Sequence, residues 1–287
     1  MVTENWREPE WLGWPYEQVV EQARVPVTVL PDTPALYRHM AEQMAAELRA
    51  NNGDDRPTRW IVPVGPTGQY GPLADLINAE RLDLSRLFTF QMDEYLDWTC
   101  RTLPPEHPLS FAGTLQRRFF NRLDADLRPP AHRHFKPDPR HLDSLAEAID
   151  LAGGIDTCWG GIGVHGHIAF NEPPSTYFQA ITDDEMKSAP TAIVALQPDT
   201  RVVNAISAAG GNFEAIPPYA VTIGMRDILA ARRIRLCAHR SLWQRAVWRR
   251  AVMQPPTARY PVTFIQEHAD AAVFVDEATA APAVPQL

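Results

Sequence analysis

The chain has 287 residues, with 27 Lys and Arg against 35 Asp and Glu, and the net charge of −8 argues against a nucleic acid or an anionic membrane surface as a partner. Its three cysteines, Cys100, Cys158 and Cys237, form no CxxC pair, so we expect a reduced, cytoplasmic protein. The first residues lack the basic start and apolar run of a signal peptide. No segment approaches the roughly 20 apolar residues that a membrane span requires, so we expect a soluble protein.

Short apolar runs alternate with helical patterns in the first third of the chain. A strand is predicted over residues 25–30, followed by a helix with Thr33 as its N-cap and Pro34 at its first position. This helix carries an apolar stripe of Leu36, Met40, Met44 and Leu48. The pattern then predicts a strand at 59–64, a glycine-bearing turn, a helix at 73–78 and a strand at 87–92.

The alternation continues through the rest of the chain. A helix through Leu145 and Ile149 is expected to end at Gly153 and Gly154, and a strand at 156–162 follows at once. Further strands are predicted at 192–196, 219–225, 233–238 and 271–275. Several of these runs are apolar on both faces, as buried parallel strands are. The sequence therefore predicts an α/β fold, a doubly wound, mostly parallel sheet with helices on both faces. We expect an N-terminal extension at 1–24, one domain at 25–277 and a flexible C-terminal tail at 278–287.

Arginines cluster at residues 231–250 beside two tryptophans, a composition that would suit stacking on nucleic-acid bases. A strand followed by an amphipathic helix explains the segment better. The apolar residues of this helix form one stripe, and Arg245 and Arg249 are predicted to lie on another face. We therefore expect no nucleic-acid partner.

In a sheet of this kind, ligands bind at the carboxyl ends of the strands, which selects the loops after 59–64, 87–92 and 156–162. The first loop, from Gly65 to Pro72, has three glycines and Thr67 between a strand and a helix. Backbone N–H groups at such a helix start bind anions, so a phosphate is the natural ligand. The loop matches neither common phosphate-binding motif, and an ordinary tight turn would look the same.

The second loop begins with Asp93 and Glu94, directly after the strand at 87–92. A half-desolvated carboxylate close to a second acid has a raised pKa and suits a base that removes a proton from carbon. A helix cap or a solvated acid at the rim is the plainer interpretation of such a pair. The pattern leaves both open.

The third loop follows the strand at 156–162 and reads GGIGVHGHIAFNEPP. His165 and His167 alternate along the chain and would point to the same side of an extended segment. Glu172 could reach back to one imidazole and fix its tautomer. Two histidines and a carboxylate could also supply metal ligands, so a metal enzyme is an alternative at this stage.

The strings FTFQMDEY and GIGVHGHIAFNEP resemble the hallmark strings of the glucosamine-6-phosphate deaminase/isomerase family, which read close to FNMDEY and GxGxDGHIAFNEP. The resemblance extends over residues 25–277 and includes QPDTRVVNA, YAVTIGM and the closing VFVDE. It implies a Rossmann-like fold and a reaction without metal or cofactor, in which an amino-sugar phosphate is ring-opened, isomerised from aldose to ketose and deaminated.

The resemblance also implies roles for individual residues. Asp93 matches the base that moves a proton between C2 and C1 of the sugar. His167 matches the acid/base of ring opening, and Glu172 matches its carboxylate partner. Arg201 matches an arginine that holds the substrate phosphate, and the loop with Gly65, Thr67 and Gly68 matches the phosphate cradle.

The sequence departs from the family pattern at several places, three of which concern the candidate site. His165 stands where the family has an aspartate, which removes a negative charge beside His167 and puts ammonia release in doubt. Tyr70 adds bulk to the phosphate loop. The phosphate-binding lysine of the family has no lysine counterpart, and Arg240 or Arg245 would have to replace it.

We therefore expect a sugar-phosphate aldose–ketose isomerase/deaminase that acts on glucosamine 6-phosphate or a related amino-sugar phosphate and gives the ketose phosphate and ammonia. The catalytic candidates are Asp93, His167, Glu172 and His165. The alternatives are an isomerase of a different sugar, a hydrolase similar to the 6-phosphogluconolactonases, and a sugar-phosphate sensor. We expect a homo-oligomer.

Overall fold

The computed structural model describes residues 8–174 and 181–284. Seven strands form one parallel sheet in the order β1-β10-β9-β6-β2-β3-β5. This arrangement confirms the predicted mostly parallel α/β fold. The bounds of the strands are β1 Val27–Leu30, β2 Thr58–Val62, β3 Leu87–Gln91, β5 His134–Phe135, β6 Thr157–Gly161, β9 Arg233–Ala238 and β10 Ala271–Asp276.

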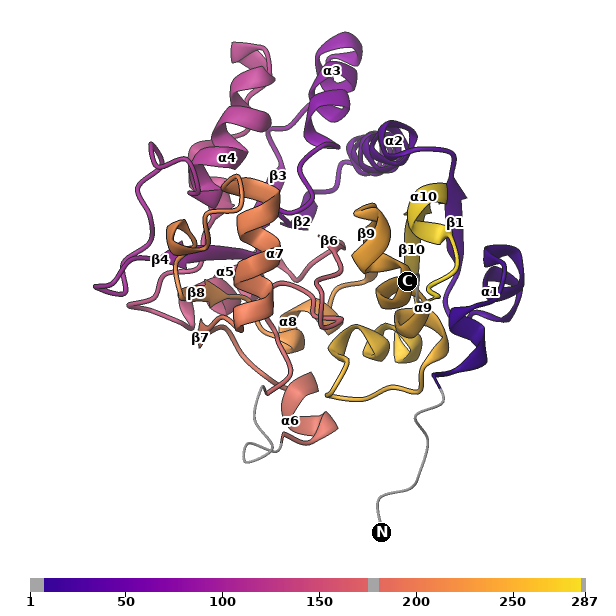
Figure 1. Cartoon of the computed structure of the whole chain (residues 1–287). Coiled ribbons are helices and arrows are strands. Elements are labelled where there is room, and N and C mark those ends of the chain that lie inside the picture. The colour runs from indigo at the N-terminus through magenta and orange to yellow at the C-terminus, as the bar shows by residue number, and fades with distance from the viewer. Residues whose placement is uncertain (1–7, 175–180, 285–287) are drawn as a thin grey trace.

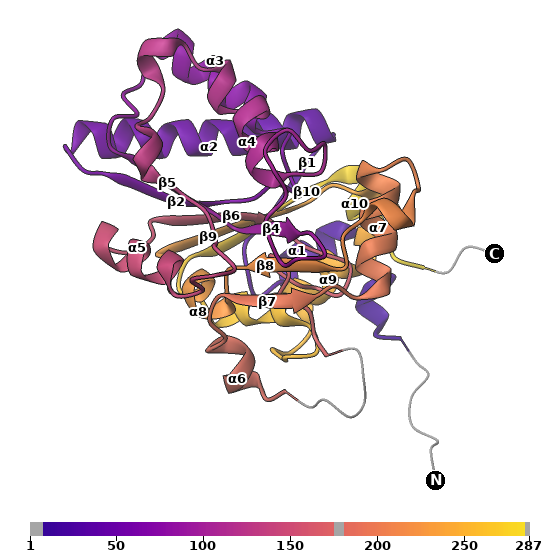
Figure 2. The same cartoon turned by 90° about the vertical axis from the view of Figure 1, so that its left-hand side faces the viewer.

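Helices cover both faces of this sheet. Figure 2 shows α2, α3 and α4 above it and α5, α8 and α9 below it. The bounds of the helices are α1 Tyr16–Gln22, α2 Thr33–Gly53, α3 Tyr70–Glu80, α4 Phe111–Arg118, α5 Ser144–Ala152, α6 Asp183–Lys187, α7 Pro198–Ala208, α8 Met225–Leu229, α9 Gln244–Met253 and α10 Glu277–Ala280. Short 3-10 helices occupy Glu10–Leu12, Phe120–Arg122, Ala125–Leu127, Ala131–Arg133, Phe213–Ala215, Ser241–Trp243 and Pro261–Glu267. Among the described residues, no helix is both long and apolar enough to cross a membrane.

The hydrophobic core lies in two layers, one on each face of the parallel sheet. The layer under α2 and α3 contains the predicted stripe of α2, which packs with Trp60 and Trp159. The layer on the opposite face is built around Phe90, Cys158 and Trp248. The two layers hold the strands rigidly, so the strand ends can position side chains for chemistry.

The N-cap of α2 differs from the prediction. Asp32, in an extended conformation, accepts a hydrogen bond from the backbone N–H of Ala35 at 2.6 Å, while Thr33 is already helical. The Thr33 hydroxyl instead donates to the carboxylate of Asp276 at the end of β10. The prediction of the C-terminal end of α5 is confirmed, since Gly153 follows Ala152 with φ of 89°.

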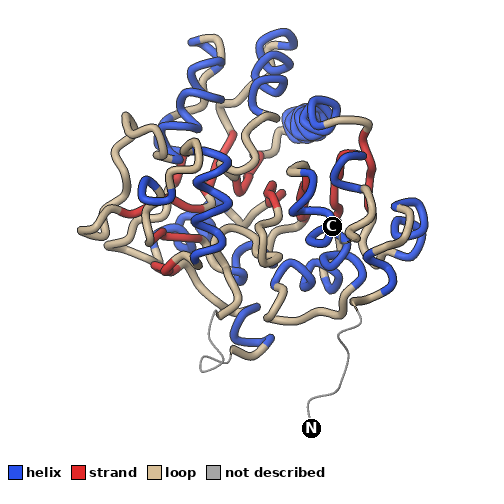
Figure 3. Tube along the Cα trace, in the orientation of Figure 1, coloured by secondary structure: helices blue, strands red, loops and turns tan. Residues whose placement is uncertain are grey.

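A second, three-stranded antiparallel sheet has the order β4-β8-β7, with β4 Asp93–Leu96, β7 Ala192–Ala195 and β8 Tyr219–Thr222. The apolar character of the runs at 192–196 and 219–225 suggested further strands of the parallel sheet. They belong instead to this antiparallel sheet. Side chains of β7 alternate between half-buried and exposed, and Ile193 is 39% exposed, as in an antiparallel sheet with one solvated face. This sheet lies to the left of the parallel one in Figure 1, and the strands are drawn red in Figure 3.

The two ends of the described chain pack against the same helix. Arg249 of α9 is fully buried, and its guanidinium donates to the backbone carbonyls of Trp11 and Ala280. The face of α9 on which Arg249 was predicted, away from the apolar stripe, is therefore covered by the chain ends. Thr279 is buried too, and the backbone N–H of Ala283 donates to Leu12, so the expected loose tail is held as far as Ala283.

Candidate active site

A cavity of about 480 Å³ lies at the carboxyl ends of β2, β3, β6 and β9. This is the edge of a parallel sheet at which ligands bind. Residues that follow these four strands line it, together with residues of α4 and α7. Its size is that of a site for a small metabolite. The predicted candidates that line it are Gly65, Thr67, Asp93, His167 and Arg240.

Asp93 lies at the start of β4, directly beyond the end of β3, and is only 7% exposed. Burial raises the pKa of its carboxyl to about 8, and the neighbouring charge of Glu94 adds to this. A carboxyl group with a pKa near the working pH can both take and return a proton, which is what proton transfer at carbon requires.

Glu94 has a different role, although it follows Asp93 directly. Its carboxylate accepts hydrogen bonds from the backbone N–H groups of Phe111 and Ala112 at 2.9 and 2.8 Å, and from the hydroxyl of Ser110. These are the free donors of the first turn of α4. Glu94 is therefore the helix cap that the plainer interpretation allowed for this acid pair, whereas Asp93 faces the cavity.

The histidine loop is a series of turns and not the extended segment that the alternation of His165 and His167 suggested. Gly166 has φ of 67°, and the rings of the two histidines lie 5.8 Å apart. The ring of His167 lies directly over Gly163, where an added Cβ would come within 1.8 Å of Nε2. Glycine at 163 is thus needed for the position of the imidazole.

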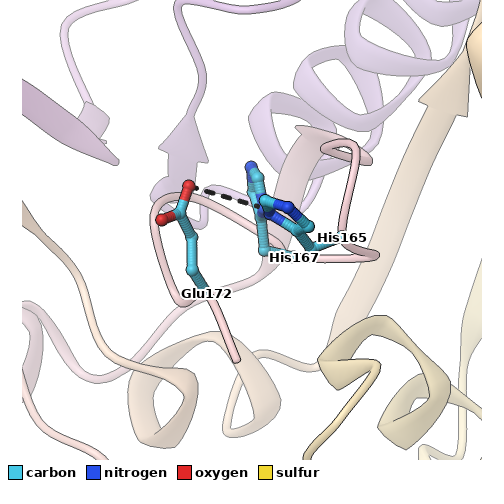
Figure 4. Close-up of side chains that lie close together, drawn as sticks. All are labelled: His165, His167 and Glu172. Carbon is cyan, nitrogen blue, oxygen red and sulfur yellow. Dashed lines mark ion pairs between the residues drawn. The ribbon is translucent and has the colours of Figure 1, made fainter. Parts of the chain in front are cut away.

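His167 is 6% exposed and lines the cavity. Burial lowers the pKa of its imidazole to about 3, and His165 adds to the effect, so the ring is neutral at neutral pH. Its Nδ1 is buried and faces Oε1 of Glu172 at 3.9 Å, too far for a hydrogen bond (Figure 4). Nε2 is the ring nitrogen that remains for the cavity.

Glu172 lies behind His167 and not on the cavity wall. Its Oε2 accepts a hydrogen bond from the backbone N–H of Gln197 at 2.8 Å, which fixes the carboxylate at the start of α7. Burial raises the pKa of this carboxyl. The predicted approach of Glu172 to an imidazole is therefore present as a facing pair without a direct hydrogen bond.

His165 also lies behind the cavity wall, and its Nε2 is 2.8 Å from the Asp199 carboxylate of α7. This contact lowers the pKa of Asp199. The carboxylate of Asp199 thus lies next to the imidazole of His165, although the histidine loop lacks the aspartate that the family has at position 165. Sequence reasoning did not assign Asp199, because its partner lies 34 residues away in the chain.

In the phosphate loop, Gly65 and Thr67 line the cavity and Gly68 does not. The ring of Tyr37 covers Gly68, where an added Cβ would come within 2.1 Å of it. Tyr70, which was expected to crowd the loop, is fully buried, and its hydroxyl donates to the carbonyl of Pro63. It therefore takes no room from a ligand in the cavity.

Two arginine side chains line the cavity, Arg240 after β9 and Arg118 at the end of α4. Within residues 8–174 and 181–284, neither guanidinium makes a hydrogen bond or ion pair, so both are available to an anion. Arg118 was missed because only the packing of α4 over the cavity brings it there. Arg245 instead donates to the backbone carbonyl of Ala278.

Comparison with known proteins gives the family. No family model matches the chain. The glucosamine-6-phosphate deaminase of Streptomyces coelicolor is 33% identical over 263 residues, which cover 88% of this chain and 91% of the relative. The chain belongs to the glucosamine-6-phosphate deaminase family. The deaminase of Rhodopirellula baltica is also 33% identical, over 222 residues that cover 75% of this chain and 79% of the relative.

Solved structures agree with this family. A structure described as a monomeric glucosamine-6-phosphate deaminase has a TM-score of 0.71 and 25% identity, and the match covers 88% of this chain and 98% of that one. A 6-phosphogluconolactonase from Thermotoga maritima has a TM-score of 0.62 and 15% identity, with 88% and 99% covered. The second likeness shows the shared fold alone.

One residue that the deaminase resemblance assigned to the phosphate is not among the residues that line the cavity. The guanidinium of Arg201 donates to the backbone carbonyl of Ile216 at 3.0 Å and lies 4.0 Å over the ring of Phe213. Of the two cationic side chains expected at the phosphate, Arg240 therefore lies on the cavity wall and Arg201 does not, while Arg118 lies there as well.

Proposed function

We propose that this chain isomerises glucosamine 6-phosphate, or a closely related amino-sugar phosphate, from aldose to ketose and releases ammonia. The main observation behind the proposal is that the buried carboxyl group of Asp93 and the neutral imidazole of His167 line the same cavity. Membership of the deaminase family supports the choice of reaction.

In the proposed reaction, His167 acts first. It takes the proton of the hydroxyl on C1 and delivers one to the ring oxygen, so that the bond between C1 and that oxygen breaks and the open-chain aldehyde forms. A neutral imidazole can do both through Nε2, the nitrogen that remains for the cavity, which takes the first proton and then gives it to the ring oxygen. Burial favours this neutral form.

Asp93 then moves a proton along the sugar. It removes the proton on C2, which lies next to the carbonyl carbon, and returns it to C1. The aldehyde oxygen gains the proton that the ammonium group on C2 gives up, so C1 becomes an alcohol carbon and the nitrogen on C2 becomes an imine. Water then adds to the imine carbon and ammonia leaves, which gives the ketose. The raised pKa of Asp93 suits a group that is ionised at the start of this step and protonated in the middle of it.

The substrate phosphate is assigned to the end of the cavity that Thr67 and Arg240 line, with Arg118 as a further cation. Two guanidinium groups in one cavity, neither with a partner in the part of the chain that the structure describes, favour a doubly charged anion over a neutral sugar.

A second outcome, isomerisation of a sugar without loss of an amine, is favoured by one observation. His165 stands where the family has an aspartate, and the nearest carboxylate to it, that of Asp199, lies on α7 and is largely exposed. The two outcomes share Asp93 and differ only in whether ammonia forms.

The test offers the purified protein glucosamine 6-phosphate, glucose 6-phosphate and unphosphorylated glucosamine, and measures ketose and ammonia separately. We expect ketose phosphate and ammonia in equal amounts from the first sugar, and much slower turnover of the third. Ketose from glucose 6-phosphate with no reaction of the amino sugar would establish the second outcome. No turnover of any of the three would contradict the proposal.

A homo-oligomer and a cytoplasmic location also stay proposals. Support for association is a set of exposed apolar side chains on α7, β7 and β8, namely Ile193, Val202, Ile206 and Tyr219. Light scattering on the purified protein measures the mass. A mass of one chain at micromolar concentration would contradict an oligomer.

A further inference from the structure

Two side chains behind the cavity wall lie close to His167, which lines the cavity, and the proposed reaction does not use all of their polar atoms. His165, His167 and Glu172 each offer one nitrogen or oxygen atom, and these atoms all lie within 4.8 Å of one another (Figure 4). They come from one stretch of eight residues, folded by the turns of the histidine loop. His167 and Glu172 are more than nine-tenths buried at their side chains, and the side chain of His165 is 17% exposed.

Each of the three residues has a buried polar atom without a hydrogen-bond partner among the described residues. These atoms are Nδ1 of His165, Nδ1 of His167 and Oε1 of Glu172. Nearly all buried polar atoms of folded proteins have a hydrogen-bond partner, so three without one in a single cluster point to a ligand.

The remaining polar atoms of two of these side chains are held from outside the cluster. Nε2 of His165 contacts the Asp199 carboxylate at 2.8 Å, and Oε2 of Glu172 accepts from the backbone N–H of Gln197 at 2.8 Å. In metal sites, a carboxylate on the second ring nitrogen of a histidine orients the first nitrogen toward the ion and raises its basicity. His165 has this arrangement with Asp199.

We propose that His165, His167 and Glu172 bind one divalent transition-metal ion, with Zn²⁺ as the best match. Two imidazoles and one carboxylate form a donor set typical of zinc, whereas Mg²⁺ and Ca²⁺ prefer oxygen ligands alone. The site goes beyond the metal-free chemistry that the sequence resemblance implies. It depends on the histidine that replaces the aspartate of the family.

The geometry of the cluster needs a small adjustment to hold such an ion. Zinc bonds of about 2.1 Å in tetrahedral directions place neighbouring ligand atoms roughly 3.4 Å apart. Nδ1 of His167 and Oε1 of Glu172 are 3.9 Å apart, and the widest separation in the cluster is below 4.8 Å. The ligand atoms must move together by about 1 Å. We expect His165 to make this movement, because its side chain is the most exposed of the three.

The position of the ion sets its role. His165 and Glu172 are not among the residues that line the cavity, so the ion lies behind His167 and not against the sugar. A metal on Nδ1 of His167 leaves the proton of the ring on Nε2, the nitrogen that remains for the cavity. The metal-bound ring would therefore act as a hydrogen-bond donor and could not take the proton of the C1 hydroxyl, so the metal-bound and metal-free states of His167 are alternatives.

The test measures metal binding without any sugar, so that its outcome is independent of the proposed reaction. The full chain is stripped with a chelator, the chelator is removed, and Zn²⁺ is titrated by calorimetry. Co²⁺ serves as a second probe, because its visible absorption reports coordination by protein ligands. We expect one ion per chain. His165→Ala and Glu172→Gln should each weaken binding at least 100-fold, and Asp199→Asn about 10- to 100-fold.

The matched control is His141→Ala, which removes an exposed histidine outside the cluster and should leave binding unchanged. Circular dichroism confirms that each variant is folded, and His165→Phe, which keeps a ring but offers no ligand atom, serves as a second variant if His165→Ala unfolds. Equal affinity and stoichiometry in the wild type and in the folded His165 variant would overturn the proposal. Absence of binding to the wild type at micromolar Zn²⁺ would overturn it as well.

Discussion

Asp93 and Glu94 are neighbours in β4, yet their carboxyl groups serve different parts of the molecule. Glu94 accepts the backbone N–H groups at the start of α4, whereas Asp93 lines the cavity. Successive side chains of a strand point to opposite sides, which separates the two acids in space. Glu94 therefore stabilises the start of α4. Asp93 lies in an environment that disfavours its charged form, and this environment prepares it for proton transfer.

The buried Asp93 carboxyl should lower the stability of the protein as the pH rises. Its pKa is about 8 in the fold and 3.8 in its unperturbed state, so the folded state holds a proton that the unfolded state loses. This contribution is fully present below pH 3.8 and is lost as the pH rises to 8. Asp93→Asn removes the effect, and we expect the variant to be more stable than the wild type by about 2–4 kcal/mol at pH 8.

Urea unfolding at pH 5, 6.5 and 8 measures this difference. The gain in free energy of unfolding should increase with pH over this range. A gain that is the same at all three values would mean that the substitution acts through packing and not through the titration of Asp93.

Glu94→Ala should have the opposite effect. The change leaves the N–H groups of Phe111 and Ala112 without an acceptor and removes a buried carboxylate that the hydroxyl of Ser110 also contacts. We expect a loss of about 2–4 kcal/mol in the free energy of unfolding at pH 7. Thermal and urea unfolding check this value, and wild-type stability in the variant would show that α4 is capped in another way.

Much of the site could be predicted from the sequence because it depends on strand ends. The carboxyl ends of parallel strands meet at one edge, so the loops of Thr67, Asp93 and His167 had to lie close together. The two sheets could not be separated in this way. The strand β4 follows β3 after a single residue, but its partner β8 lies more than 100 residues further along, and the local pattern carries no sign of that pairing.

The sequence also could not predict which side chains of a helix point into the cavity. Arg118 reaches the cavity and Arg201 does not, although both lie on helices at its edge. Which face of a helix meets the cavity depends on how the whole helix packs, and a match to a motif assigns a position in the chain without a direction. Tyr70 shows the same limit, since its ring entered the core and not the loop.

Arg118 offers a direct test of the anion end of the cavity. Arg118→Ala should raise the KM for a phosphorylated substrate about 10- to 100-fold, with a smaller effect on kcat, because the lost contact is equal in ground and transition states. Arg117→Ala is the matched control, since Arg117 is the adjacent arginine on α4 and donates to the carbonyl of Pro105 instead. An equal effect of the two changes would remove Arg118 from the site.

Gly163→Ala tests the placement of His167. The added Cβ would come within 1.8 Å of Nε2, so the imidazole must rotate away, while the backbone itself tolerates alanine. We expect kcat to fall at least 100-fold with a loss of stability below about 2 kcal/mol. Gly53→Ala, where nothing lies within 4 Å of the new Cβ, is the control. Normal turnover of Gly163→Ala would contradict the role of His167 in ring opening.

The measurement that tests the central claim most directly follows the hydrogen on C2 of glucosamine 6-phosphate in deuterated water. With the wild-type protein, we predict that solvent deuterium enters the sugar and that kcat/KM increases with pH up to an apparent pKa of about 8. With Asp93→Asn, exchange should fall by about 10²- to 10⁴-fold while the sugar phosphate still binds. Exchange at the wild-type rate in Asp93→Asn would show that another group removes the proton from carbon.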